Sequence, residues 1–269
     1  MNARTPHFID DYHLLSYDSL DSTNEEAKRL AAAGGQHGAV IWANEQTNGK
    51  GRDGRQWQSM AGNLHFSLLL RPHLSVESLP ELSFVTSLAL FRTVKTLVEN
   101  DTEIAIKWPN DLLLAGAKLA GILLETCHDG KGDPWVIIGV GLNVERHPEI
   151  AGYPTTSLKA AGLEIISAKI VLSRFLNMFE CLYDEWVEHG FKNIRQQWLT
   201  HSAYLHDNIS LQYGDEKITG EFTSIDEHGN LMLRVDGAIK TFAAGDVHMK
   251  NPLSNSPSSN SLSSNEEQI

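Results

Sequence analysis

Residues 49–57 read GKGRDGRQW, residues 107–111 read KWPND, and KLAG follows at residues 118–121. The first of these stretches interleaves three glycines with three cationic residues. Glycine lets backbone amides approach an anion closely, and guanidinium groups bind carboxylate or phosphate oxygens through paired hydrogen bonds. A loop of this composition is therefore a candidate site for a nucleotide or an acyl phosphate.

Glycine and arginine are also common in ordinary solvated loops, so the spacing has to decide. The loop lacks the Lys-Ser/Thr ending of a P-loop. A second stretch, IIGVGLNV, contains Gly139 and Gly141, but Val144 stands where the dinucleotide-binding pattern needs its third glycine. Both common phosphate-binding motifs are excluded.

The composition indicates a catalytic domain of roughly 200 residues with a small appendage. The chain has 269 residues, with 22 Lys and Arg against 34 Asp and Glu, which gives a net charge of −12. Nonspecific nucleic-acid affinity comes mainly from Lys and Arg that neutralise phosphates. We therefore expect no nucleic-acid partner.

Cysteine and histidine usage points to the cytoplasm. The two cysteines, Cys127 and Cys181, have no disulfide or zinc spacing, and the 12 histidines form no HExxH or comparable pattern. We expect no metal ion held by the protein itself. The N-terminus lacks a signal-peptide core, and the longest near-apolar run, residues 82–91, is too short to span a bilayer. The sequence predicts a cytoplasmic protein without a membrane segment.

Apolar periodicity predicts the elements of the larger domain. Ser22 and Thr23 each stand three residues before a glutamate, as in a capping box, ahead of a helix that ends at Gly34. Further helices are expected at residues 80–99, 167–189 and 193–203, and strands at 39–43, 64–70, 104–108, 112–114, 119–126 and 135–144. These elements form no regular βαβ repeat, so we expect an α+β domain at residues 1–205, with a mixed β-sheet and helices on one face.

The pattern changes after that domain. Short strands separated by glycine turns at Gly214, Gly229 and Gly237 predict a small β-barrel at residues 206–250. Residues 251–269 are mostly Ser and Asn and predict a disordered tail.

Together these stretches resemble the biotin protein ligase family, whose signature is a GRGRRGR-W loop, a KWPND strand end and a KLAGIL strand. The sequence also has STN at residues 22–24 and GVGLNV at 139–144, in the family's order. The resemblance runs from about residue 15 to about residue 250. Inside the loop, Lys50 and Asp53 replace two of the family's arginines.

The resemblance implies a class II aminoacyl-tRNA synthetase-like sheet followed by a Src-homology-3-like β-barrel. Only about 20 residues precede STN, so the expected form is the monofunctional one, without an N-terminal DNA-binding domain. The implied reaction uses ATP, with Mg²⁺, to convert biotin into biotinyl-5′-AMP. The biotinyl group then passes to a lysine of the biotin carboxyl carrier protein or domain of a biotin-dependent carboxylase.

The resemblance also assigns roles to individual residues. The catalytic residues would be Arg52, Lys118 and Asp111, the last to orient Arg52, to assist the metal or to accept a proton from the acceptor amine. Biotin would contact Ser22, Thr23, Asn24, Gln46, Lys50, Gly51, Arg52 and Lys118. ATP or the adenylate would contact Gly49, Arg52, Arg55, Trp57, Lys107, Asn110 and Asn143. Asp246 and Lys250 stand near the places of a nucleotide-side glutamate and arginine.

Two other functions remain open at this stage. Lipoate ligases and octanoyltransferases share the general architecture, although the GKGRDGRQW loop fits biotin ligation better. A noncatalytic biotin or nucleotide sensor would result if Asp53 had damaged the loop. The sequence also leaves open whether a homodimer forms through an exposed strand edge.

Overall fold

The computed structural model describes residues 7–9, 12–99, 101–130, 132–150, 153–164 and 166–249. The expected disordered tail lies outside these residues, and the domain limits at 205 and 250 stay a prediction. None of the described helices is long and apolar enough to cross a membrane.

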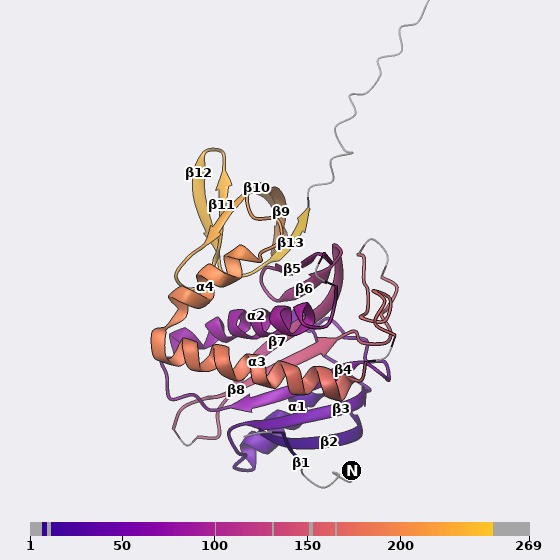
Figure 1. Ribbon diagram of the computed structural model, residues 1–269. Helices are drawn as coiled ribbons and strands as arrows, with labels where there is room; N and C mark the ends of the chain where they lie inside the picture. The colour runs from indigo at the N-terminus through magenta and orange to yellow at the C-terminus, as the bar shows by residue number, and fades with distance from the viewer. Residues whose placement is uncertain are drawn as a thin grey trace, which may run out of the picture.

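A mixed eight-stranded sheet forms the larger domain (Figure 1). Its strand order is β1-β2-β3-β4-β8-β7-β6-β5, with β2 and β3 parallel and every other neighbouring pair antiparallel. The strands are β1 (His7–Ile9), β2 (Tyr12–Leu20), β3 (Ala39–Gln46), β4 (Leu64–Leu70), β5 (Ile104–Lys107), β6 (Asp111–Leu114), β7 (Ala117–Cys127) and β8 (Trp135–Leu142). The α+β mixed sheet is confirmed.

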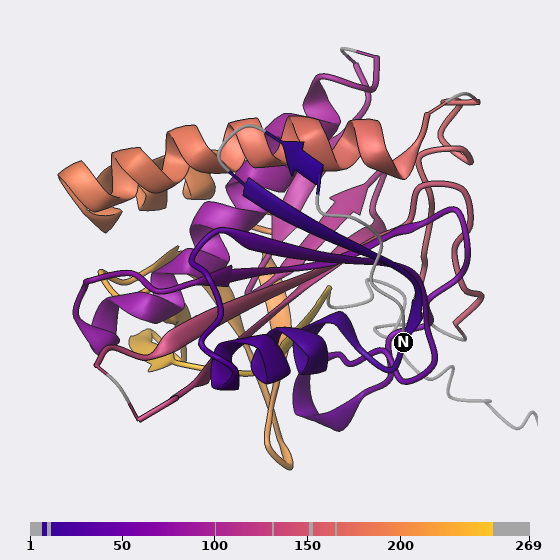
Figure 2. The same cartoon turned by 90° about the horizontal axis from the view of Figure 1, so that it is seen from below.

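The helices divide between the two faces of this sheet, as Figure 2 shows. Alternate residues of β4, such as Leu68, join a core with α2 (Leu82–Lys95) and α3 (Ala168–His189), while Leu69 joins a second core with α1 (Thr23–Ala32). The expectation that all helices lie on one face is therefore wrong for α1. The sequence shows that α1 is amphipathic but not which face of the sheet it meets.

Local signals set both ends of α3. Ser167 caps α3 by accepting a hydrogen bond from the Ile170 amide at 3.3 Å, and Gly190 ends that helix with a φ of 73°. The expected helix at residues 80–99 begins as the 3₁₀ helix η2 (Val76–Glu81) and continues as α2. The capping box at Ser22 does not form, because the Ser22 side chain makes no cap hydrogen bond.

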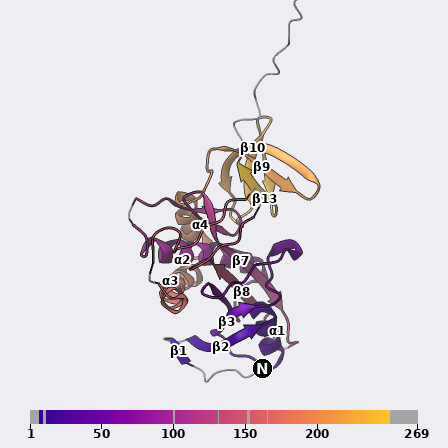
Figure 3. The same ribbon diagram turned by 90° about the vertical axis from the view of Figure 1, so that its right-hand side faces the viewer.

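A smaller sheet follows α4 (Phe191–Thr200) and stands above the larger domain (Figure 3). Its antiparallel order is β12-β11-β10-β9-β13, from β9 (Asn208–Tyr213), β10 (Glu216–Ile225), β11 (Leu231–Val235), β12 (Ala238–Phe242) and β13 (Asp246–Met249). The two edge strands, β12 and β13, are not paired with each other among the described residues. The arrangement is consistent with an SH3-like domain, although its hydrogen bonds do not close a barrel.

Candidate active site

A cavity of about 290 Å³ lies between three parts of the structure. These are the face of the large sheet that α1 covers, the loop of residues 49–57, here called the glycine loop, and strand β13. Of the candidate site residues that the structure describes, all except Gly49 line it, namely Ser22, Thr23, Asn24, Gln46, Lys50, Gly51, Arg52, Arg55, Trp57, Lys107, Asn110, Asp111, Lys118, Asn143 and Asp246. Lys250 lies outside the described residues. Segments that are far apart in the sequence therefore meet at one place. The Gly49 carbonyl instead accepts a hydrogen bond from the Trp57 amide at 2.9 Å, which joins the two ends of the loop.

The first turn of α1 forms a polar corner of the cavity. The Thr23 amide donates to Gln46 Oε1 at 2.8 Å, and Thr23 Oγ1 lies 2.7 Å from Ser67 Oγ. Asn24 Nδ2 donates to Glu125 Oε2 at 2.7 Å, while Asn24 Oδ1 accepts from Ser67. These bonds fix hydroxyl and amide groups for a small polar ring in the cavity.

Two glycines of GVGLNV make room for this arrangement. A methyl group on Gly139 would overlap the Asn24 amide, and one on Gly141 would overlap the Trp57 indole. The Trp57 ring also lies against Gly121 of the neighbouring strand. The glycines thus let two site side chains lie directly on the sheet.

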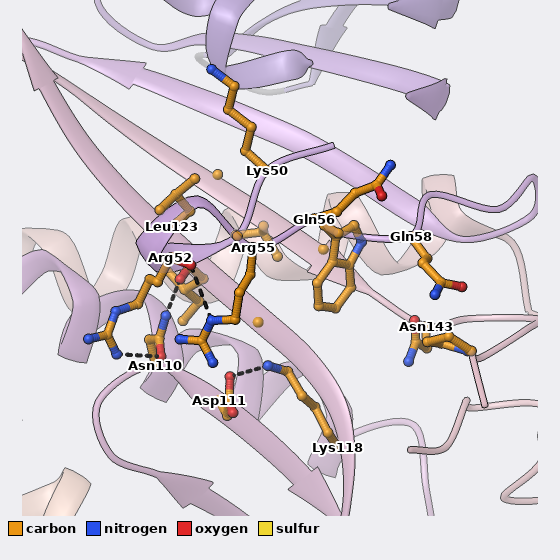
Figure 4. A pocket seen from close by; sticks show the side chains of 18 of the residues that line it. Lys50, Arg52, Arg55, Gln56, Gln58, Asn110, Asp111, Lys118, Leu123 and Asn143 are labelled. Carbon is orange, nitrogen blue, oxygen red and sulfur yellow. Dashed lines mark hydrogen bonds and ion pairs between the residues drawn. The ribbon is translucent and has the colours of Figure 1, made fainter. Parts of the chain in front are cut away.

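A buried ionic cluster occupies the other end of the cavity (Figure 4). Asp111 Oδ1 is 2.6 Å from Lys118 Nζ, and Asp111 Oδ2 is 3.2 Å from Lys107 Nζ. Tyr153 donates its hydroxyl proton to Asp111 Oδ2 at 2.9 Å. One carboxylate therefore holds two ammonium groups at the cavity wall.

Protonation states within the cluster follow from burial and charge. Burial disfavours the charged Asp111 carboxylate, but Lys118 and Lys107 outweigh burial and hold the pKa of Asp111 below its ordinary value. Burial lowers the pKa of the Lys107 ammonium, with Asp111 opposing this effect. Burial and the nearby Asp111 charge raise the pKa of the Tyr153 phenol. The phenol therefore stays protonated at neutral pH.

The glycine loop brings Arg52 into the same region. Arg52 donates to Asn110 Oδ1 at 3.4 Å, so Asn110, and not Asp111, orients this guanidinium. Lys50 points the other way in Figure 4, and its ammonium pairs with Glu25 of α1 at 2.6 Å. At Lys50, the backbone and not the side chain is therefore placed to face a ligand.

Asp53 does not enter the cavity. Its side chain is 71% exposed and lies 3.2 Å from Arg55. Its φ of 55° falls in the left-handed region that Asp tolerates better than most residues. The replacement of an arginine by Asp53 therefore puts no negative charge against a bound anion.

Several site residues escaped the sequence analysis. Ser67 was visible only as a polar residue within an apolar strand pattern, and Glu125 and Tyr153 gave no sequence signal at all. His248 also lines the cavity, beside Asp246, whose carboxylate is 2.9 Å from Arg55. The small domain thus supplies part of the cavity wall.

Two polar atoms of residues in the cavity lining have no hydrogen-bond partner among the residues that the structure describes. Trp57 Nε1 and Asn143 Oδ1 are both buried, and Asn143 uses only its amide nitrogen, which donates to the Thr156 carbonyl at 2.9 Å. The indole nitrogen of Trp57 lies over Gly141 on the sheet.

Fold and cavity define the class of protein, and comparison with known proteins agrees. Residues 17–143 match the model of the biotin/lipoate A/B protein ligase family, and residues 207–250 match the model of the biotin protein ligase C-terminal domain. The chain is similar to the biotin–[acetyl-CoA-carboxylase] ligase of Paracoccus denitrificans, with 35% identity over 232 residues that cover 84% of this chain and 96% of the relative.

Two further relatives indicate the same class of protein. The bifunctional ligase/repressor BirA of Bacillus subtilis is 32% identical over 88% of this chain and 74% of its own length. A solved structure of Aquifex aeolicus biotin protein ligase in complex with biotin and ATP superposes with a TM-score of 0.76 at 28% identity, covering 87% of this chain and 97% of that one. The chain belongs to the biotin protein ligase family.

Proposed function

We propose that this ligase activates biotin with ATP and transfers the biotinyl group to a lysine of a biotin carboxyl carrier protein or domain. A single observation carries the proposal: the polar corner at Thr23, Asn24 and Gln46 and the cations Lys107 and Lys118 line one cavity. At one end the cavity has hydrogen-bonding groups that suit a neutral polar ring, and at the other end it has cations that suit anions. The solved relative in complex with biotin and ATP supports the same pairing of ligands.

In the first step the biotin carboxylate attacks the α-phosphate of ATP. A P–O bond forms, pyrophosphate leaves with the electron pair of the broken P–O bond, and biotinyl-5′-AMP results. The carboxylate is already ionised at neutral pH, so no general base is needed. Lys118, Lys107 and Arg52 reduce the repulsion between the two anions and hold them in place.

In the second step the acceptor lysine attacks the acyl carbon as a neutral amine. The amide C–N bond forms, AMP leaves with the electrons of the mixed anhydride bond, and the amine loses a proton. We assign the Ser22–Asn24 turn and Gln46 to biotin, the loop backbone at Lys50 and Gly51 to its carboxylate, and Trp57 and Asn143 to the nucleotide base. Arg55 and Asn110 complete the nucleotide side of the cavity.

Mg²⁺ enters as part of the nucleotide substrate. Among the described residues, no group of three or more His, Cys, Asp or Glu side chains is placed to hold an ion. Asp111 is already engaged by two ammonium groups. We therefore assign the ion to the ATP phosphates and water, which suits the slow dehydration of Mg²⁺.

The partner is the biotin carrier of a biotin-dependent carboxylase, in keeping with the name of the Paracoccus relative, a biotin–[acetyl-CoA-carboxylase] ligase. The described residues include two free cysteines, Cys127 and Cys181. Free thiols and an ATP-dependent reaction fit the cytoplasm, where thiols stay reduced.

The test is mass spectrometry of an isolated carrier domain after incubation with the protein, biotin, ATP and Mg²⁺. We expect one biotinyl group in amide linkage on one lysine, and no product when lipoate replaces biotin. The variant Arg52→Gly should release biotinyl-5′-AMP into solution, because the loop loses a cation that holds the adenylate. Biotin binding without any pyrophosphate release would contradict the proposal and favour a sensor.

A further inference from the structure

Tyr153 lies inside the ionic cluster, although no sequence pattern pointed to it. Its hydroxyl oxygen accepts a hydrogen bond from Lys107 Nζ at 2.6 Å and donates its proton to Asp111 Oδ2 at 2.9 Å. Its ring lies 4.8 Å from Lys107 Nζ and 5.8 Å from Lys118 Nζ. One phenol therefore contacts all three charged groups of the cluster.

The backbone that carries Tyr153 also holds two site residues. The Lys118 amide donates to the Pro154 carbonyl at 2.9 Å, and the Thr156 amide donates to the Lys118 carbonyl at 3.0 Å. The Thr156 carbonyl accepts from the Asn143 side chain. Residues 153–156 thus run beside the start of β7 and fix both the main chain of Lys118 and the ring that lies between the lysines.

The geometry divides the oxygens of Asp111 between separate partners. Oδ2 is engaged by Lys107 and Tyr153, which leaves Oδ1 to Lys118 at 2.6 Å. A carboxylate with both oxygens engaged is a poor acceptor for another proton. Asp111 therefore orients cations, and the acceptor amine loses its proton elsewhere.

We propose that Tyr153 is a positioning residue for biotin activation, which holds Lys107 and Asp111 so that Lys107 and Lys118 face the reacting carboxylate and α-phosphate. The inference rests on the proposed function and deepens it. Tyr153 acts through the lysines and need not touch the reacting atoms.

Other titratable groups also face the cluster and influence its electrostatic potential. The small domain contributes Asp246 and His248, the glycine loop contributes Arg55, and Tyr204 precedes the small sheet. A substitution that removes only the Tyr153 hydroxyl leaves these groups in place. A change in pH dependence then reports on the hydroxyl itself.

The test is Tyr153→Phe, which keeps the ring and removes the hydroxyl. Biotin-dependent exchange of pyrophosphate into ATP measures the activation step alone. We expect kcat to fall about tenfold, as for loss of one hydrogen bond to a charged group, with the KM for biotin little changed. Lys107 loses an acceptor for its ammonium, so its pKa falls further and the alkaline limb of the kcat profile moves to lower pH.

Tyr17→Phe is the matched control, because the Tyr17 hydroxyl donates to the Glu26 carboxylate at 3.1 Å outside the cavity. It should leave kcat and the pH profile unchanged. Unchanged kcat in Tyr153→Phe, or a lower kcat with an unmoved alkaline limb, would overturn the inference while leaving ligation intact. A wild-type protein that exchanges no pyrophosphate would instead refute the proposed function.

Discussion

At the scale of single residues, close contact explains the glycines of the cavity floor. Gly141 lies under the Trp57 indole, and Gly139 lies under the Asn24 amide. Gly121 stands opposite Gly141 in β7, so these two neighbouring strands both lack a side chain at this point. At these positions the sheet therefore presents backbone to the Asn24 and Trp57 side chains.

Gly141→Ala tests this packing. The added methyl would displace the Trp57 ring, and we expect the KM for ATP in pyrophosphate exchange to rise at least tenfold. Overpacking of this kind also costs about 1–3 kcal/mol of stability. Thermal unfolding of the same samples separates the two effects.

A double-mutant cycle with Trp57→Phe supplies the control. The smaller ring leaves room for the methyl, so the two effects on KM should not add. Additive effects would show that Gly141 matters for a reason other than contact with Trp57.

At the scale of elements, the buried carboxylate of Glu81 links the 3₁₀ helix η2 to helix α3. Glu81 ends η2 and is only 8% exposed, and Trp186 of α3 donates to its Oε2 at 2.6 Å. Burial raises the pKa of Glu81, and the Trp186 hydrogen bond only partly offsets this. The folded state therefore favours the protonated acid, which is a cost at neutral pH.

Glu81→Gln should show this cost in the pH dependence of unfolding. Because the folded pKa lies above the unfolded one, wild-type stability from this group is greatest below the unfolded value and is lost as pH rises through the folded value. We expect the variant to melt at a higher temperature than wild type at pH 7. A gain of about 1 kcal/mol in the free energy of unfolding would raise the melting temperature by up to ~4 °C. The gap should shrink near pH 4.

The exposed Glu164→Gln is the matched control, and it should leave the melting temperature unchanged at both pH values. An equal gap for Glu81→Gln at the two pH values would show that ionisation of this carboxyl is not the cause.

At the scale of the whole molecule, the small domain contacts the large one through several separate hydrogen bonds and an ion pair. Trp108 Nε1 donates to the Gly229 carbonyl at 3.0 Å, and Arg195 of α4 donates to the Ile225 carbonyl at 2.8 Å. The pair of Arg55 and Asp246 joins the glycine loop to β13 at 2.9 Å. The loop therefore closes against both domains.

Asp246→Asn tests whether this contact retains the adenylate. The pair is partly exposed, so its loss should change stability by under about 1 kcal/mol. Freed from β13, the loop should open more often, and biotinyl-5′-AMP should leave the protein several times faster. Stopped-flow dilution of the preformed complex measures the dissociation rate.

Glu221→Gln removes a similarly exposed pair with Arg234 in the same domain and serves as the control. The inference would be wrong if both variants released the adenylate at the wild-type rate.

Local patterns alone determined a large part of this protein. Alternation along Leu64–Leu70 predicted β4, Ser167 and Gly190 predicted both ends of α3, and the spaced glycines and arginines predicted an anion-binding loop. These features depend on neighbours within a few residues, so the sequence carries them directly. The family signatures then predicted most of the cavity lining.

Only the tertiary structure decided which face α1 covers, that Asn110 rather than Asp111 orients Arg52, and that Tyr153 lies between Lys107 and Asp111. Each depends on contacts between segments that are distant along the chain. Strand order and side-chain direction create those contacts, and neither leaves a periodic trace in the sequence. The prediction of an anion-binding loop therefore came from its residues alone, whereas the partners that orient its charges were fixed by the way the sheet brings remote strands together.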